Sequence, residues 1–445
     1  MKEGDILNNQ IKEVAKEFLE KSQGKEVFIV SHFDTDGITS AAIMTQALRK
    51  MDRKFSLKIL KNLENEFIDT IPKDKLILFL DLGSGSLQHI NDANLKNVFI
   101  VDHHEINPEL INPEMKIINP ELSSKQKISG SGLTYLFCKE LDKSNVEFSK
   151  LAVLGMIGDT LEKQIDKLNN QIIIDGDIKK KRGILIYPST RPLNRTLEFC
   201  SNPFIPEVTG NPKGVTEILR ETGLNCSNGK YKSLIELNEE EMEKLVTAIM
   251  LRNPKIKHNE IIGDIFLIKF YNKLEDAREL SAQINACSRM GFPDVALQFC
   301  LEMPKAKKTA EALYAKYRQS LISGLKFIKE TEKIKGKGFV IINGKDKIKD
   351  TMVGTFASIL SNSALYEEGT IITTMAYNDD KIKVSVRNVG REGRNVREVL
   401  ARAIINVGGE VGGHEFAAGC MIKKEQETVF IEALKKHLEI ELIKI

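Results

Sequence analysis

Val98-Phe-Ile-Val-Asp-His-His104 is the stretch of this sequence that decides its fold. Four hydrophobic residues that end abruptly in one acid and two imidazoles predict a buried strand with polar groups at its carboxyl end. In open parallel α/β sheets, ligands bind at that edge. Successive side chains of a strand point to opposite faces, so we expect Asp102 and His104 on one side and His103 on the other.

The same pattern occurs twice upstream. The apolar run Lys25–Val30 leads into Ser31-His-Phe-Asp-Thr-Asp-Gly37, and the run Lys75–Leu80 leads into Asp81. Helical patterns lie between and after these runs, for example over residues 38–51. Strands that alternate with helices indicate βαβ units and a parallel sheet. We therefore expect the three strand ends to present their His and Asp side chains at one edge of the sheet.

The residue types at these strand ends suit divalent metal ions. Imidazole plus carboxylate, with no thiol nearby, suits Mn²⁺, Fe²⁺ or Zn²⁺, whereas all-oxygen sites favour Mg²⁺ or Ca²⁺. The candidate ligands are too many for one ion and are enough for two ions that share a bridging carboxylate. Two such ions can stabilise the attacking and leaving oxygens of a phosphoryl displacement. The candidates are His32, Asp34, Asp36, Asp81, His103 and Asp159.

Each of these residues, taken alone, has an ordinary structural interpretation. An aspartate at the end of a strand commonly caps the following helix or forms a turn, and a lone histidine is commonly structural. However, four of the seven histidines fall inside short Gly- or Asp-rich polar clusters, and these four are His32, His103, His104 and His414. The catalytic interpretation is therefore preferred.

These motifs resemble those of the DHH phosphoesterase superfamily. The matching residues are His32-x-Asp34-x-Asp36-Gly37, Asp81, Asp102-His-His104 and Gly158-Asp159. The resemblance extends from about Val27 to Cys420 and is weakest between Lys163 and Ile261, where no motif is recognised.

Three further segments resemble parts of the same superfamily. Gly412–Gly419 (GGHEFAAG) resembles the signature of the DHHA1-type substrate domain. Ile284–Gly291 (INACSRMG) resembles a motif of the RecJ branch, and Val353–Ser358 is similar to archaeal RecJ-like nucleases. The Lys-, Ile- and Asn-rich composition also hints at an archaeal source.

The resemblance implies a role for each candidate ligand. Asp81 would bridge two divalent ions, for which Mn²⁺ is expected, with Mg²⁺ or Co²⁺ as alternatives. His32 and Asp34 would coordinate one ion, and Asp36, His103 and Asp159 would coordinate the other.

The resemblance also implies roles for the two remaining residues of the opening tripeptide. Asp102 would act from outside the ligand sphere by orienting His103, and such partners fix the tautomer and direction of an imidazole. His104 would face the substrate phosphate.

The C-terminal glycine cluster predicts a second site, for the substrate. Gly412-Gly413 belongs to a loop that can take positive φ, so successive N–H groups could form an anion nest to which His414 adds a donor. An ordinary glycine-rich turn is the alternative. By the resemblance, Arg387 and this loop hold the nucleotide.

Arg289, with Asn285 in the same motif, is a further candidate for binding phosphate, because a guanidinium matches phosphate oxygens in a bidentate way. The alternative is that Arg289 is a surface arginine that caps a helix.

The length and composition of the chain limit the classes of protein to which it can belong. A chain of 445 residues is long enough for two or more domains, and 42% hydrophobic with 29% charged residues is an ordinary profile for a water-soluble protein. We expect no membrane segment and no signal peptide. The six cysteines show no C-x-x-C spacing, which argues against a disulfide framework or a zinc ribbon. We therefore expect the protein to be located in the cytoplasm.

A net charge of +3 does not by itself indicate nucleic-acid binding, so the distribution of charge matters. One basic stretch, Lys179–Arg182, is followed by Arg191 and Arg195. The other, Lys305–Lys337, has helical periodicity. A charged face is more often merely solvated than functional. The second stretch would nevertheless border the path of a nucleic-acid strand.

The expected fold class is α/β: a doubly wound, largely parallel DHH lobe joined by a long helix to a smaller α/β DHHA1 lobe, with the active site in the cleft between them. The expected domains are 1–162, the catalytic domain; 163–263, an insertion or extension of partly helical character; 264–303, a return to the catalytic lobe; 304–335, the connector helix; and 336–445, the DHHA1 domain.

Three functions compete. The preferred one is a hydrolase, a RecJ-like exonuclease that releases mononucleotides from single-stranded DNA or RNA in replication or repair, with proteins of that machinery as partners. The second is an oligoribonuclease, a 3′-phosphonucleotide phosphatase or a cyclic-dinucleotide phosphodiesterase. The third is a non-catalytic replication or repair scaffold, which would not need to keep six candidate ligands.

Overall fold

The computed structural model describes residues 3–123, 125–200, 203–254, 256, 261–363, 365–409 and 411–439. The chain divides into two compact units. The first unit comprises residues 1–183 and 263–314, and the second unit comprises residues 184–262 and 315–445.

The first unit is built on a parallel sheet of five strands in the order β2-β1-β3-β4-β5. Because β1 is flanked by β2 and β3, the connections from β1 and β3 leave toward opposite edges of the sheet. The point between β1 and β3 is therefore the switch point at which open α/β sheets bind ligands. The strands are β1 (Val27–His32), β2 (Phe55–Leu60), β3 (Leu76–Leu80), β4 (Val98–Val101) and β5 (Lys116–Ile118).

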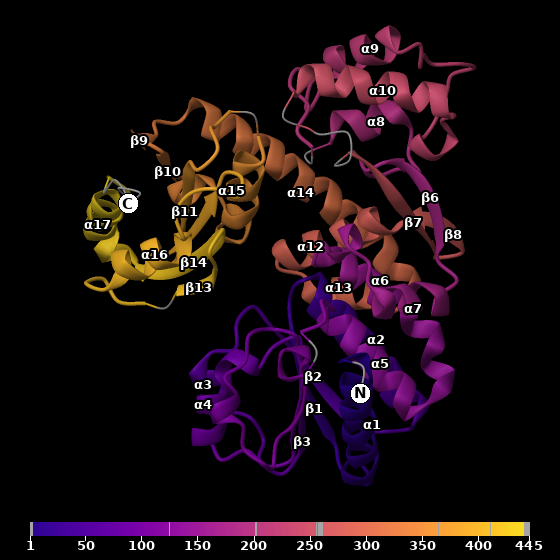
Figure 1. The fold of residues 1–445 in the computed structure, drawn as a ribbon, viewed down its shortest axis with the longest axis vertical. Coiled ribbons are helices and arrows are strands. Elements are labelled where there is room, and N and C mark those ends of the chain that lie inside the picture. Colours follow the sequence, from indigo (N-terminus) through magenta and orange to yellow (C-terminus); the bar gives the residue numbers. More distant parts are fainter. Residues whose placement is uncertain are drawn as a thin grey trace. The chain divides into compact units, whose positions relative to one another are not determined.

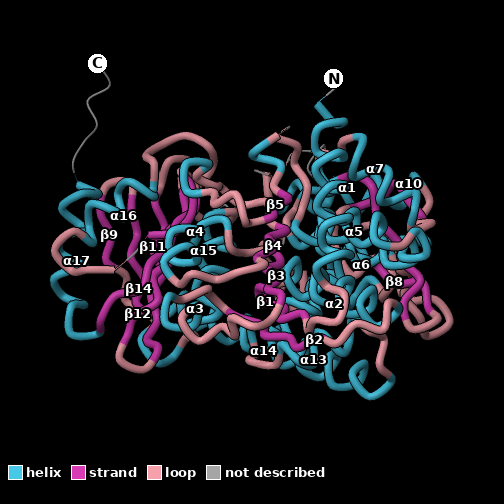
Figure 2. The backbone as a smooth tube through the Cα atoms, turned by 90° about the horizontal axis from the view of Figure 1, so that it is seen from below, coloured by secondary structure: helices cyan, strands magenta, loops and turns pink. Residues whose placement is uncertain are grey.

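Helices cover both faces of this sheet (Figures 1 and 2). Leu78 and Leu80 of β3 pack in a core with α1, α2, α5 and α6, whereas Ile77 and Phe79 pack in a second core with α3 and α4. Strands buried on both faces are continuously apolar, as the sequence shows. The helices of this region are α1 (Glu3–Lys21), α2 (Thr35–Lys50), α3 (Asn65–Ile68), α4 (Leu87–Asp92), α5 (Gly130–Leu141), α6 (Ser149–Gly158) and α7 (Lys167–Asp175).

The first strand begins later and ends later than its apolar run suggests. It continues through Ser31 and His32, which pair with Ile59 and Leu60 of β2. Pairing with β2 therefore carries the strand past its last hydrophobic residue. The first residues of the polar segment, Ser31 and His32, are therefore held in place by the sheet.

The first unit is completed by a small sheet and by helices from a later part of the chain. The sheet has the order β6-β7-β8, and the helix α12 packs against α6 and α2. These elements are β6 (Lys179–Ile184), β7 (Ile262–Phe270), β8 (Lys273–Asp276), α12 (Ala277–Arg289) and α13 (Pro293–Cys300). The 27-residue helix α14 (Pro304–Glu330) then runs from the first unit into the second.

Two of the hydrophobic cores formed by the described residues lie in the second unit. The first core lies among α8 (Leu193–Glu198), α9 (Pro212–Glu221) and α10 (Glu239–Arg252). These helices lie within residues 163–263, for which a partly helical character was expected. The second core belongs to a lobe with a sheet of six strands.

That sheet has the order β13-β14-β12-β11-β10-β9. One face packs on α16 and α17, and α15 packs on β11 and β12. The elements are β9 (Ile334–Gly336), β10 (Phe339–Asn343), α15 (Val353–Ser361), β11 (Ile371–Asn378), β12 (Lys381–Asn388), α16 (Val396–Ile404), β13 (Val411–His414), β14 (Ala417–Lys423) and α17 (Glu427–Glu439).

The predicted fold class is confirmed: the protein has a parallel α/β lobe, a second and smaller α/β lobe, and a long helix that enters both units. The domain boundaries at 162, 263, 303 and 335 and the active site in a cleft between the lobes stay predictions. Among the described residues, no helix is both long enough and apolar enough to span a membrane.

Candidate metal centre

The segment after β1 places two carboxylates within one turn of helix. Asp34 is the N-cap of α2, and its carboxylate accepts a hydrogen bond from the N–H of Gly37 at 3.0 Å. Asp36 follows in the first turn of the same helix. A Cβ at position 37 would lie 2.3 Å from the carbonyl oxygen of His32, so only glycine allows this tight return of the chain.

Asp36 is 1% exposed, and the N-terminus of α5 meets its carboxylate. The N–H groups of Gly130 and Ser131 donate to its two oxygens at 2.5 Å and 3.0 Å. Charge-assisted bonds from a helix N-terminus stabilise a buried anion. They also fix the direction of the carboxylate, so its position does not depend on a ligand.

Two glycines leave the space that this arrangement requires. A Cβ at Gly155 would lie 2.0 Å from the Ser131 hydroxyl and 2.3 Å from Asp36 Oδ1. A Cβ at Gly130 would lie 2.7 Å from Asp81 Oδ1. Helices α5 and α6 can therefore approach the carboxylates only with glycine at these positions.

Asp81 follows β3 and takes the left-handed backbone conformation, with a φ of 58°. This conformation costs a non-glycine residue roughly 1–2 kcal/mol, and such strain is concentrated at functional sites. Asp81 is 1% exposed, and among the described residues neither of its oxygens accepts a hydrogen bond.

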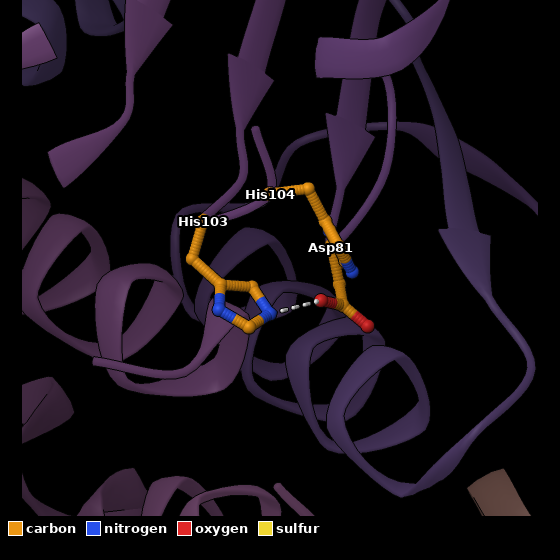
Figure 3. Close-up of side chains that lie close together, drawn as sticks. All are labelled: Asp81, His103 and His104. Carbon is orange, nitrogen blue, oxygen red and sulfur yellow. Dashed lines mark ion pairs between the residues drawn. The ribbon is translucent and has the colours of Figure 1, made fainter. Parts of the chain in front are cut away.

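Two imidazoles flank Asp81, one near each carboxylate oxygen. His103 Nε2 lies 3.3 Å from Oδ1 (Figure 3), and His32 Nδ1 lies 3.5 Å from Oδ2. His32 Nδ1 also lies 3.0 Å from Asp34 Oδ2. Asp81 thus stands between a histidine from β1 and a histidine that follows β4.

His103 is surrounded by carboxylates from three elements. Its Nε2 lies 3.8 Å from Asp36 Oδ2 and 3.5 Å from Asp159 Oδ2, in addition to the contact with Asp81. Asp159 is the C-cap of α6 and its Oδ2 is buried without a hydrogen-bond partner in the described chain. These acids therefore converge on a single imidazole nitrogen.

The donor atoms form groups that could each hold a metal ion, with all atoms of a group within 4.8 Å of one another. One group is His32, Asp34 and Asp81, a second is Asp36, His103 and Asp159, and a third is Asp81, His103 and His104. The first two groups are the sets that the resemblance implies, although the ligand roles themselves stay predictions. Buried, unpartnered oxygens at Asp81 and Asp159 fit divalent cations well.

Asp102 orients His104 and not His103, so the expectation for this residue is wrong. Its Oδ1 lies 2.7 Å from His104 Nδ1 and also accepts the backbone N–H of His103 at 2.8 Å. Its Oδ2 accepts the N–H of Ser84 at 2.9 Å. The reason is the alternation of side chains along an extended chain: residues two apart lie on the same side, and neighbours do not.

The burial of the carboxylates changes their protonation. Burial, together with the charge of Asp81, raises the pKa of Asp36 to about 7. Burial and the charge of Asp36 raise the pKa of Asp159 well above its usual range. Burial alone would lower the pKa of His103, but its close contact with the Asp81 carboxylate and the charge of Asp36 raise it to about 9. Without a cation, the cluster therefore holds protons near neutral pH.

In the pair formed by Asp102 and His104, the hydrogen bond and the opposite charges outweigh the effect of burial on both pKa values. Burial would raise the pKa of Asp102, but the hydrogen bond and charge of His104 hold it well below its usual range. Burial would lower the pKa of His104, and the hydrogen bond and charge of Asp102 raise it instead. Asp102 is therefore an anion and His104 favours the imidazolium.

Asn285 and Arg289 lie on α12, in the same unit as the cluster. The beginning of α12 adjoins it, because the Thr35 hydroxyl donates to the carbonyl of Ser281 at 3.1 Å. Arg289 Nε donates to Asn285 Oδ1 at 3.0 Å. At 1.5 Å per residue, Asn285 and Arg289 stand about 6 Å and 12 Å further along the helix axis than Ser281.

Arg387 and the residues 412–414 lie in the second unit, on the strands β12 and β13 that flank β14. Arg387 and His414 are both paired with Ala417 of β14, from opposite sides. The guanidinium of Arg387 donates to the hydroxyls of Ser358 and Ser385 at 3.2 Å and 3.0 Å.

The expectation of a glycine loop at residues 412–414 is wrong. Gly412, Gly413 and His414 belong to the edge strand β13, which pairs with β14 in a hairpin. Of these residues only Gly413 has a positive φ, at 114°. The cause is long-range pairing with β14, which a local glycine pattern does not reveal.

Several supporting residues were missed at the level of sequence. Gly130, Ser131 and Gly155 position Asp36, and the Asn119 side chain donates to the Ser84 hydroxyl and the His104 carbonyl, both at 2.9 Å. The small-residue run Ser129–Gly132 before a helix was the one available signal.

Comparison with known protein families covers most of the chain. The sequence matches the N-terminal domain of the DHH family over residues 26–158, the DHH-CID domain over residues 186–260 and the DHHA1 domain over residues 335–439. The chain belongs to the DHH/DHHA1 superfamily. The DHH-CID match covers the middle of the chain, in which no motif was recognised from the sequence.

The chain is 28% identical to an uncharacterised protein of Methanocaldococcus jannaschii, over 95% of this chain and 96% of that protein. It is 24% identical to the single-stranded-DNA-specific exonuclease RecJ of Dickeya dadantii, over 39% of this chain and 34% of that protein. The chain therefore spans only about a third of the length of that RecJ.

Solved structures share the fold over nearly the whole chain. An exonuclease RecJ bound to manganese has a TM-score of 0.59 at 16% identity, over 97% of this chain and 95% of that one. CDC45 from Entamoeba histolytica has a TM-score of 0.68 at 12% identity, over 97% of this chain and 99% of that one. The DHH/DHHA1 architecture of the protein is thus shared by proteins of divergent sequence.

The substitution Gly155→Ala is expected to weaken metal binding, because the new methyl group would displace Ser131 and Asp36. Overpacking of this kind costs about 1–3 kcal/mol of folding stability, and we expect at least a tenfold loss of Mn²⁺ affinity. Titration calorimetry and thermal denaturation measure the two effects. Gly85→Ala is the matched control, since a Cβ there meets no atom within 4 Å. Equal affinities for Mn²⁺ in the two variants would contradict the role of Gly155.

Metal affinity is expected to rise with pH between 6 and 8. In the metal-free protein Asp36 titrates near 7 and His103 near 9, so a cation must displace their protons, and raising the pH removes this competition. Each displaced proton contributes about tenfold in affinity per pH unit below its pKa. Mn²⁺ titrations in two buffers of different ionisation enthalpy count the protons. Asp36→Asn should remove the step near pH 7, and a wild-type affinity independent of pH would exclude this linkage.

Proposed function

We propose that this protein is a metal-dependent phosphodiesterase that removes mononucleotides from an end of single-stranded DNA or RNA. The observation that carries the proposal is Asp81, a buried and strained carboxylate with an imidazole near each oxygen and further acids beside both. Two divalent ions, for which Mn²⁺ is expected, would when bound stabilise charge on the attacking and leaving oxygens and supply hydroxide at neutral pH.

The residues that would hold the two ions come from the ends of β1, β3, β4 and α6 and from the beginning of α2. Asp81 would bridge the ions because it is close to both histidines. One ion would take His32 and Asp34 from β1 and the turn after it. The other would take Asp36, His103 and Asp159.

The chain's own groups would prepare this site before substrate arrives. The N–H groups of Gly130 and Ser131 hold Asp36 in place, so no reorganisation of that ligand is needed at the moment of reaction. Asp102 holds His104 through Nδ1, which leaves Nε2 for a ligand. The raised pKa of His104 favours a protonated Nε2, which would donate a hydrogen bond to a phosphate oxygen of the substrate.

The smaller lobe would bind the nucleotide through Arg387. Its guanidinium donates to the hydroxyls of Ser358 and Ser385 and to the carbonyl of Val386, and these hydrogen bonds fix the direction of a planar group that matches phosphate oxygens. Two residues away along β12 the sheet carries small residues, because Ser385 is paired with Gly419, and Gly419 with Gly412. A flat, glycine-rich surface next to a fixed arginine suits a phosphate or sugar. The motif that holds Asn285 and Arg289 would add contacts to the substrate strand.

The nuclease is preferred over a smaller substrate because curated relatives named as single-stranded-DNA-specific exonucleases match part of the chain. The scaffold alternative gains support from the likeness to CDC45, but the complete set of candidate ligands argues against it. A place in the cytoplasm with replication or repair proteins as partners would accompany the nuclease function.

The proposal predicts release of mononucleotides from end-labelled single-stranded DNA or RNA in the presence of Mn²⁺, and none after chelation. Asp81→Asn should lower the rate by at least about a hundredfold, since the bridging charge contributes several kcal/mol to transition-state stabilisation. Asparagine tolerates the left-handed conformation at this position, so circular dichroism should show an intact fold. Cleavage only of dinucleotides or 3′-phosphonucleotides would support the small-substrate enzyme, and no cleavage at all would support the scaffold.

Arg387→Ala is expected to raise KM about tenfold and leave kcat within about twofold, because a phosphate-binding group outside the scissile bond stabilises substrate and transition state alike. Steady-state kinetics on a single-stranded oligonucleotide separates the two constants. Arg402→Ala is the control: Arg402 is an exposed arginine of the same lobe, and its guanidinium lies 3.7 Å from the Glu398 carboxylate on α16. A fall in kcat with KM unchanged would contradict the binding role of Arg387.

A further inference from the structure

The edge strand β6 carries a run of exposed cations that the proposed active site does not use. Lys179, Lys180, Lys181 and Arg182 are all exposed, whereas the last two residues of the strand are buried. β6 lies at the edge of the sheet β6-β7-β8. In the sequence, residues 178–197 contain six basic residues and no acidic one.

The surroundings of Lys180 and Arg182 leave both residues positively charged. Arg182 lies 4.0 Å from Asp264, with side chains 69% and 43% exposed, and an exposed pair at this distance contributes little. Lys180 donates to the Asn170 side chain at 3.4 Å and lies over the Phe266 ring at 5.6 Å from its centroid. An amide and an aromatic ring orient a lysine without neutralising its charge.

The spacing of these charges suits a polyanion. Side chains two residues apart on a strand share a face and lie about 6.6 Å apart, so each face of β6 presents two cations in line. A single lysine is often enough to keep an edge strand from pairing with another chain, whereas four adjacent cations repel one another. A regular row of negative charges, such as the phosphates of an extended single strand, would relieve that repulsion.

We propose that the basic edge strand, Lys179–Arg182, binds the sugar-phosphate backbone of a single-stranded nucleic acid beyond the nucleotides that reach the metal centre. The proposal rests on the proposed function for the class of ligand. The basic edge strand belongs to the same compact unit as the candidate ligands. It follows α7, and α7 packs against α6, the helix that Asp159 caps. Short substrates would not reach it, so its contribution depends on substrate length.

The test compares the full-length protein carrying Lys179→Gln, Lys180→Gln, Lys181→Gln and Arg182→Gln with the wild type. Binding of a fluorescent 30-nucleotide single strand is measured by anisotropy, with Asp81→Asn in both proteins to prevent cleavage. The matched control carries glutamine at four dispersed, exposed lysines of the same unit: Lys12, Lys16, Lys25 and Lys73. It changes the net charge by the same amount.

The strand variant should bind the 30-mer at least tenfold more weakly than the control. The slope of log K against log salt should fall by up to about 2.8, or about 0.7 for each phosphate that the strand no longer neutralises. Hydrolysis of a dinucleotide by the otherwise wild-type strand variant should stay unchanged. Affinity and slope equal to those of the control would overturn the proposal, as would weaker binding of an acidic peptide with the single strand unaffected.

The two proposals fail separately. If the wild type binds the 30-mer without cleaving it and the strand variant loses that binding, the basic edge strand stands and the nuclease function does not. If the wild type cleaves single strands and the strand variant binds them as well as the control does, the nuclease function stands and the role of β6 is wrong.

Discussion

Burial of several carboxylates around one imidazole is the constraint on which the rest of this structure depends. Asp36 and Asp81 are almost fully buried, and His103 stands beside both and beside Asp159. Like charges in a buried site repel one another and resist ionisation, which the raised pKa values of Asp36 and Asp159 express. The N-terminus of α5, the glycines of α5 and α6 and the positive φ of Asp81 all serve to hold these groups together. Such an arrangement costs folding free energy, which bound cations would compensate.

The fold separates the candidate chemistry from the candidate recognition of substrate. All the candidate metal ligands lie in the first unit, whereas Arg387 and His414 lie on the sheet of the second. Each unit has hydrophobic cores of its own, and the helix α14 enters both units. The likeness of the fold to both a RecJ nuclease and CDC45 is consistent with a scaffold on which the functional residues, not the architecture, determine the activity.

Much of the first unit could be predicted from local patterns. The apolar runs before Asp81 and Asp102 are central strands of a parallel sheet, and their polar ends lie together at its edge because parallel strands all point the same way. The middle of the chain was harder: it forms a helical core of its own, and its amphipathic helices carry no residue of distinctive chemistry. The partner of Asp102 was missed because the orienting role was assigned by resemblance, although the alternation of side chains already favoured His104.

By itself, the sequence determined the class of fold, the set of candidate ligands and the superfamily, since these depend on hydrophobic periodicity and on residue types at strand ends. Only the tertiary structure decided which histidine Asp102 holds, that Gly412–His414 form an edge strand, and that Gly130, Ser131 and Gly155 support Asp36. The reason is sequence distance. Gly130 and Gly155 are 94 and 119 positions from Asp36, and a close approach between helices so far apart in the chain leaves no local pattern beyond a glycine.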